Sequence, residues 1–176
     1  MPYYELQDIT KVVGKITSVS AEIVRPSDVI GYTDGDVVSN STTTTTPILL
    51  ANIFREAGSS GYLTKLRIST DKKSITPRLR LHFFNVNTAT VSGDNLPFKE
   101  VYADSSKREG YWDMPAMITA KDTTNSDMSR SVDLSCRVAV NAAPGSKDLY
   151  VVLETLDAFT PASGQKFTLA AAMDNN

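Results

Sequence analysis

The stretch "SVDLSCRVAV", residues 131 to 140, alternates apolar and polar side chains along its whole length. One face would carry Val132, Leu134, Cys136, Val138 and Val140, while Asp133, Ser135 and Arg137 would occupy the other. Because successive side chains of an extended chain point to opposite sides, a period of two indicates a β-strand with one buried face. The rest of the chain repeats this pattern.

Several other stretches show the same alternation. Their predicted core-facing sets are Val19, Ala21 and Ile23; Tyr62, Leu66 and Ile68; Leu79, Leu81 and Phe83; Leu149, Val151 and Leu153; and Phe167, Leu169 and Ala171. Further strands are expected within residues 29–38, 48–54, 98–103 and 111–117, and short helical turns within "ADSSKREG" and "ANIFREAG". Turn-forming stretches such as "TDGD" and "APGSKD" separate them. About eight strands without a long amphipathic helix predict an all-β fold, a single antiparallel β-sandwich that is jelly-roll-like.

The polar run "NSTTTTTPILL", residues 40 to 50, could be a linker or part of the domain. Five consecutive β-branched threonines disfavour a helix and suit an extended chain, and Pro47 restricts the run to an edge because it lacks a ladder donor. No internal repeat or shift in composition marks a second domain. We therefore expect a short N-terminal arm over residues 1–15 and one β-sandwich domain over residues 16–176. The threonine run would be an extended edge segment that leads into a buried strand at residues 48–50.

Composition limits the classes of partner. The chain has 176 residues, enough to bury a core, and its 18 Lys and Arg against 20 Asp and Glu give a net charge of −2. This balance offers no broad surface for phosphates, so we expect no nucleic-acid partner. No apolar run approaches the length of a membrane span and the first residues do not resemble a signal peptide, so we expect no membrane partner and no export.

The two residue types best suited to catalysis, histidine and cysteine, each occur once in the chain. His82 is the one histidine, which excludes metal sites built from two histidines, and the alternation puts it on the non-core face as an ordinary surface or interface histidine. Cys136 is the one cysteine, which excludes an internal disulfide and fits a reducing cytoplasm. Its place on an apolar face predicts a buried, inert thiol.

Paired carboxylates could in principle serve glycoside hydrolysis. The candidate pairs are Asp34 with Asp36 and Asp122 with Asp127, all in loops whose polar composition already explains them. No Gly-rich phosphate loop and no nucleophile-elbow motif occurs. We expect no enzyme, no catalytic residue, no metal ligand and no cofactor.

Two segments have the side chains of an interaction surface. The segment "MPYYELQ" carries Tyr3, Tyr4 and Leu6, and the segment "EGYWDMPAM" carries Tyr111, Trp112, Met114 and Met117. Aromatic and methionine side chains are enriched in the cores of interfaces, so Tyr3, Tyr4, Leu6, Tyr111 and Trp112 are candidate contact residues. Two alternatives stay open: Trp112 and Met114 could pack in the domain core, and the terminal arm could be disordered.

Three stretches carry a resemblance to a known group of proteins. These are "STTTTTPILLANIFREAGSSGYLTKLRIST", "RLRLHFFNVNTATVSGDNLPF" and "REGYWDMPAM". Together they resemble the capsid decoration proteins of tailed bacteriophages, also called cement or head-stabilisation proteins. The resemblance is one of pattern and spans about residues 42 to 117.

The resemblance implies a non-enzymatic virion protein on the capsid exterior that is assembled in the bacterial host cytoplasm. It implies homo-oligomers, dimers or trimers, with the phage major capsid protein as partner, so that the candidate residues would contact the capsid or another subunit. A carbohydrate- or receptor-binding phage domain is the main alternative, because sandwiches with exposed aromatics also stack on sugar rings. An enzyme is a third possibility, since fold alone does not determine function.

Overall fold

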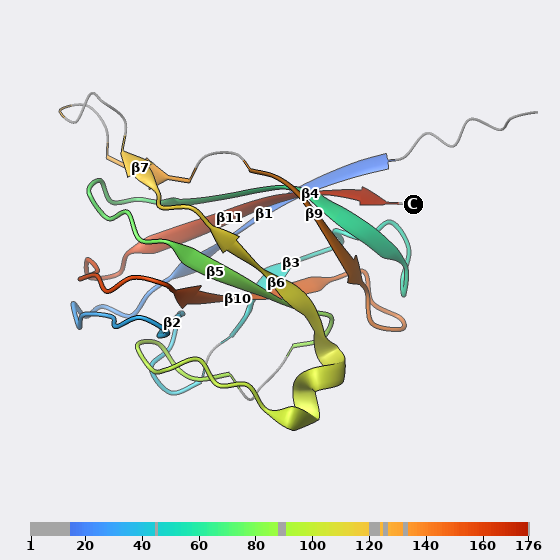
Figure 1. Ribbon diagram of the computed structural model, residues 1–176, viewed down its shortest axis with the longest axis horizontal. Helices are drawn as coiled ribbons and strands as arrows, with labels where there is room; N and C mark the ends of the chain where they lie inside the picture. The colour runs from blue at the N-terminus through green and yellow to red at the C-terminus, as the bar shows by residue number, and fades with distance from the viewer. Residues whose placement is uncertain are drawn as a thin grey trace, which may run out of the picture.

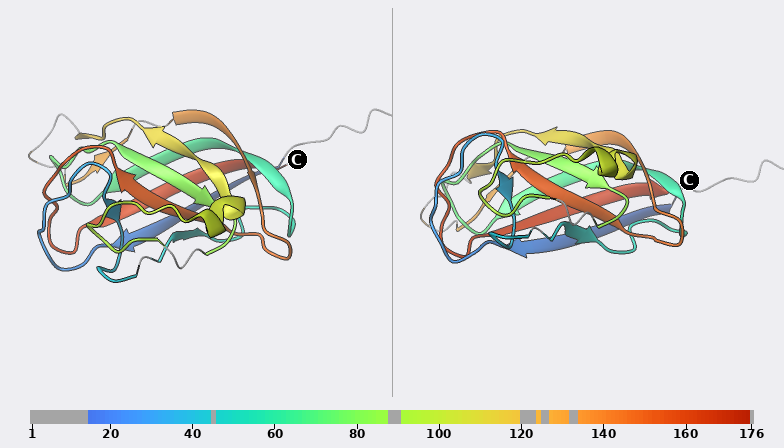
Figure 2. Two further views of the ribbon diagram at one scale, coloured as in Figure 1. Left: turned by 60° about the horizontal axis from the view of Figure 1, so that its bottom comes forward. Right: turned by 90° about the horizontal axis from the view of Figure 1, so that it is seen from below.

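A computed structural model describes residues 15–44, 46–87, 91–119, 124, 127–131 and 134–175. Two antiparallel sheets pack face to face around one hydrophobic core (Figures 1 and 2). The strands are β1 (Lys15–Val24), β2 (Val37–Val38), β3 (Ile48–Leu50), β4 (Ser60–Thr70), β5 (Leu79–Phe84), β6 (Arg108–Met114), β7 (Ile118–Thr119), β8 (Ser129–Arg130), β9 (Leu134–Asn141), β10 (Leu149–Thr155) and β11 (Lys166–Asn175). The predicted all-β sandwich is confirmed.

The order of the strands is that of a jelly roll. One sheet runs β1-β11-β4, and β4 then pairs with β9 over one part of its length and with β8 over another. In the other sheet, β10 lies between β5-β6 on one side and the short strands β2 and β3 on the other. The orders β1-β11-β4-β9 and β3-β10-β5-β6 therefore face each other, as in a double-sheet jelly roll.

The predicted core faces lie between the two sheets. Fully buried side chains include Leu66, Ile68, Leu79, Leu81, Phe83, Leu149, Val151, Phe167 and Leu169. Val19, Ala21, Cys136 and Val138 face the same core but are only half-buried. Cys136 therefore lies on the predicted face and is less buried than predicted, since it belongs to β9, which covers only one part of β4.

The prediction for Tyr62 is wrong because β4 contains a β-bulge. In the ladder with β11, Leu63 and Lys65 pair with the consecutive residues Met173 and Ala172, so Thr64 is one extra residue in β4 and reverses the faces of the side chains before it. Leu63 is thus fully buried, while Tyr62 is half-buried on the outer face. The guanidinium of Arg137 lies 4.5 Å from the centre of the Tyr62 ring.

Four expected strands are shorter than predicted or missing. Residues 29–38 contain only β2, residues 48–54 contain only β3, and residues 111–117 contribute the end of β6. Residues 98–103 form no strand and lead into a 3-10 helix, η1 (Tyr102–Lys107), which confirms the helical turn expected within "ADSSKREG". The segment "ANIFREAG" has turns and bends but no helix.

The threonine run does lead into β3, but its described residues bend rather than extend. The hydroxyl oxygen of Ser41 accepts hydrogen bonds from the backbone N–H of Thr43 and Thr44, at 3.3 and 3.4 Å. Such local bonds compete with strand pairing. The backbone of Gly93 packs so closely here that an added Cβ would lie 2.2 Å from the carbonyl oxygen of Thr42.

Candidate interaction site

The candidate residues Tyr111 and Trp112 are neighbours on β6 and therefore point to opposite faces of the sheet. Trp112 is half-buried and packs against the hydrophobic core, as one alternative predicted. Tyr111 points away from the core and is 52% exposed. Of the two, only Tyr111 is available to a partner. The other three candidates, Tyr3, Tyr4 and Leu6, lie outside the described residues.

Two arginines hold the ring of Tyr111. The guanidinium carbons of Arg80 and Arg108 lie 4.7 and 5.6 Å from the ring centre, close enough for cation–π attraction. Arg80 donates two hydrogen bonds to the carboxylate of Asp113, at 2.5 and 2.9 Å, and Arg108 donates to Glu100. Carboxylates thus orient both guanidiniums beside the ring through charge-assisted hydrogen bonds.

His82 lies beneath this surface and is buried, with 2% of its area exposed, so the prediction of a surface histidine is wrong. The segment before η1 folds over the outer face of β5, and the ring of Phe98 stacks on His82 at 3.9 Å. A second hydrophobic cluster forms there from Val37, Phe84, Val91, Val152, Phe98 and Tyr150. Alternation within β5 predicts the face of the strand correctly, but it does not predict that a distant segment covers that face.

Neighbouring groups fix the protonation of His82. Its Nδ1 lies 3.1 Å from Nη2 of Arg108, and its Nε2 lies 2.6 Å from Oε2 of Glu154. A guanidinium can only donate, so Nδ1 accepts and Nε2 carries the proton that is donated to Glu154. Burial, aided by the charges of Arg108 and Arg80, lowers the pKa of His82 from 6.5 to about 3. The neutral imidazole is therefore the folded form at neutral pH.

This shift links stability to pH. The pKa of His82 is lower in the folded chain than in the unfolded chain. The contribution of neutral His82 to the free energy of unfolding is therefore complete above pH 6.5 and is lost as the pH falls toward 3. Burial raises the pKa of Glu154, which has the opposite effect on stability. The contribution of Glu154 to the free energy of unfolding is present at acidic pH and is lost as the pH rises.

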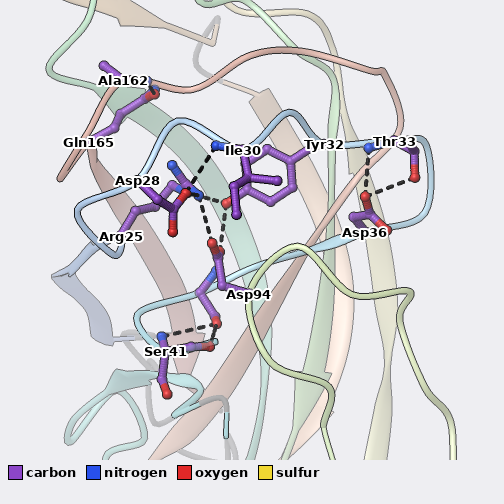
Figure 3. Close-up of polar contacts among 11 residues, drawn as sticks. Arg25, Asp28, Ile30, Tyr32, Thr33, Asp36, Ser41, Asp94, Ala162 and Gln165 are labelled. Atoms are coloured by element: carbon purple, nitrogen blue, oxygen red, sulfur yellow. Dashed lines mark hydrogen bonds and ion pairs between the residues drawn. The ribbon is translucent and has the colours of Figure 1, made fainter. Parts of the chain in front are cut away.

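A buried polar network lies at one end of the sandwich (Figure 3). The carboxylate of Asp94 accepts hydrogen bonds from Nη2 of Arg25 at 2.7 Å, from the hydroxyl of Tyr32 at 2.6 Å and from the backbone N–H of Ser39 at 2.7 Å. Arg25 also donates to the hydroxyl of Tyr32, and Tyr32 stacks on Phe159 at 4.7 Å. These contacts join four loops, which connect β1 to β2, β2 to β3, β5 to η1 and β10 to β11.

Sequence reasoning did not identify this network. Arg25 and Asp94 are 69 residues apart, and each lies beside a turn where a charged residue is ordinary. Burial lowers the pKa of Arg25, but the hydrogen bond to Asp94 and the nearby negative charge raise it by more, so the guanidinium stays charged. Burial also raises the pKa of Tyr32, which keeps its hydroxyl protonated as a donor.

Of the candidate carboxylates, Asp34 is exposed and Asp36 is buried. Asp36 accepts hydrogen bonds from the backbone N–H and the hydroxyl of Thr33, at 2.6 and 2.9 Å, which is a turn-stabilising role. Asp127 is exposed, and Asp122 lies outside the described residues. Within the described ranges, no group of three His, Cys, Asp or Glu side chains is placed to hold a metal ion, and no helix is long and apolar enough to cross a membrane.

No protein-family model matches the sequence, and no curated protein matches it. Among solved structures, the chain is similar to one described as "Sacbrood virus of honeybee", with 10% sequence identity over 97% of this chain and 75% of that chain. The TM-score is 0.25, and at that value this weak similarity to a virus protein carries no argument about function.

Proposed function

We propose that this chain is a non-enzymatic structural protein of a phage virion, a decoration or cement protein on the outside of the head that stabilises contacts between capsomers. The phage major capsid protein would be its partner. The observation that carries the proposal is the exposed ring of Tyr111, which the guanidiniums of Arg80 and Arg108 flank on the outer face of β6. The jelly-roll architecture is compatible with this role, although capsid and lectin domains share it.

A fixed aromatic ring favours binding for two reasons. Large aromatic side chains dominate interface energetics when they fill a pocket on the partner. A ring that is already immobilised loses little conformational entropy on binding, so more of the contact energy appears as affinity. In the proposed complex, Tyr111 is the central contact, and Tyr3, Tyr4 and Leu6 in the N-terminal arm add a second one.

Stabilisation of the shell follows from mass action. A protein that binds the assembled shell and not the separated subunits shifts the equilibrium toward the shell, by about 2.7 kcal/mol per site at a hundredfold excess over the dissociation constant. Each molecule that bridges two capsomers also raises the effective concentration of the neighbouring contacts. Modest contacts repeated over a lattice are therefore sufficient.

The test uses heads that lack this protein. Adding the purified chain should raise the temperature at which such heads lose DNA or break. Tyr111→Ala should weaken binding roughly tenfold or more, as for a central aromatic contact. Tyr102→Ala is the matched control, because Tyr102 is 93% exposed and lies in η1 rather than on the sheet. Heads that do not bind the chain, and whose stability does not change, would contradict the proposal.

The exposed Tyr111 also supports a second candidate function, in which the chain is a carbohydrate- or receptor-binding domain of a phage. Its ring is open to solvent and has arginine and carboxylate groups beside it, which suits stacking and hydrogen bonding to a sugar. A glycan array separates the two functions. Binding to glycans that is lost in Tyr111→Ala, without any binding to heads, would favour the second.

A further inference from the structure

The strand β1 is an open edge of its sheet. It stands at the end of the order β1-β11-β4, and among the described residues it pairs only with β11. Figure 2 shows β1, in blue, along one side of the sandwich. It is ten residues long and contains neither proline nor glycine. Such an edge can add the strand of another chain, because one row of its backbone groups has no partner within the sheet.

The register with β11 shows which backbone groups point outward. Arg25 donates its backbone N–H to the carbonyl of Gln165 at 2.9 Å, and this pair continues the β1–β11 register by one residue. In an antiparallel ladder, residues bonded to the partner alternate with residues that are not. Odd-numbered residues of β1 therefore bond to β11. The open-edge set, whose N–H and C=O groups face outward, is Ile16, Ser18, Ser20, Glu22 and Val24.

The side chains of the open-edge set are all exposed. Ile16 and Val24 are 64% and 46% exposed and lie four residues on either side of Ser20. Natural edge strands usually carry charges or proline at such positions, which prevent pairing. The set has one charged member, Glu22, which lies 3.1 Å from the ammonium of Lys166 on β11. The two ends of the edge carry exposed β-branched apolar residues, which favour cross-strand packing.

We propose that two copies of this chain pair antiparallel along β1, about a two-fold axis at Ser20, and join their β1-β11-β4 sheets into one continuous sheet. Ile16 then lies opposite Val24 of the second copy, at both ends of the pair. Moving the axis by one residue would put Ile16 opposite Glu22 or beyond the end of the strand. The contact is isologous, because the same edge serves on both copies. This inference goes beyond the proposed function and does not depend on it.

The pairing should be reversible. One added strand buries less surface than the roughly 1,600 Å² of a standard stable interface, so the dimer should form at high concentration and dissociate on dilution. The short strand β3, which borders the other sheet on this side, pairs with β10 and forms no ladder with β1.

Cross-linking tests the position of the axis. In a Cys136→Ser background, Ser20→Cys would place two cysteines directly opposite each other, with Cα atoms about 5.5 Å apart and within reach of a disulfide. Ser18→Cys is the matched control, because its two copies would be about 14 Å apart at roughly 3.4 Å per residue. We expect oxidation to convert Ser20→Cys to a covalent dimer and to leave Ser18→Cys monomeric. Equal cross-linking of both, or none of either, overturns the proposal.

Charge replacement tests the register independently. Sedimentation of the native chain from millimolar to low micromolar concentration should show a mass near twice 19.1 kDa that falls to one chain. The double variant I16K/V24K places like charges opposite each other and should be monomeric. I16K/V24E loses the same apolar pair but places opposite charges together and should dimerise. A native chain that is monomeric at millimolar concentration, or two variants that behave alike, overturns the proposal.

Discussion

Replacing Asp94 by asparagine should strongly destabilise the fold, because it removes the charge that compensates a buried arginine. Arg25 and Asp94 both have fully buried side chains, and their charged groups are 2.7 Å apart. Asparagine keeps the shape of the side chain and one acceptor oxygen. The guanidinium then retains only Asp28 as a carboxylate partner, at 3.2 Å and partly exposed (Figure 3).

The expected magnitude follows from the burial of the pair. Breaking a buried ion pair on one side costs about 3–5 kcal/mol, because the remaining charge stays desolvated. A domain of this size loses about 2–4 °C of melting temperature per kcal/mol. Asp94→Asn should therefore lower the melting temperature by roughly 6–20 °C.

A double-mutant cycle measured by thermal or urea denaturation tests this reasoning. Arg25→Met combined with Asp94→Asn should cost clearly less than the sum of the two single changes, since no uncompensated charge remains. Asp157→Asn is the matched control. Asp157 pairs with Arg78, whose Nη2 lies 2.7 Å from Oδ1 of Asp157 and whose side chain is 53% exposed. Because exposed ion pairs contribute little to stability, the melting temperature should hardly change. Additive single effects, or an Asp94→Asn variant as stable as the control, would refute the argument.

Three further predictions concern separate features. Lowering the pH from about 7 to about 4 should reduce the urea midpoint of the native chain more than that of His82→Gln, because His82 must be protonated on unfolding; equal pH dependence would exclude His82 as the source. Gly93→Ala should strongly lower the melting temperature, since its Cβ would lie 2.2 Å from the carbonyl oxygen of Thr42. Gly31→Ala is the control, because its Cβ would make only ordinary contacts, so this variant should unfold like wild type. The thiol of Cys136 should react several-fold more slowly in the native than in the denatured chain, because burial raises its pKa and its Sγ donates to the Leu63 carbonyl; equal rates would show that β9 does not pack on β4 as described.

The sequence by itself determined the long strands and most of their inward faces. The alternation in β5, β10 and β11 predicts which side chains face the core, because the two-residue period of an extended chain is a local property. The bulge in β4 makes this prediction wrong at Tyr62, since one extra residue on a single strand is visible only against its partner strand, β11. The same alternation separates Tyr111 from Trp112, so only one of the two can face the core once β6 is assigned.

Only the tertiary structure decided what covers each outward face. His82 and Tyr111 project from the same face and pair directly across β5 and β6, yet one is buried and the other exposed. The difference comes from Phe98, which no local pattern places over His82. Arg25 and Asp94 likewise become partners only when the loop after β1 meets the loop after β5. Pairing between distant residues depends on how the strands are connected and stacked, and the physical signal for it is absent from any short stretch of the chain.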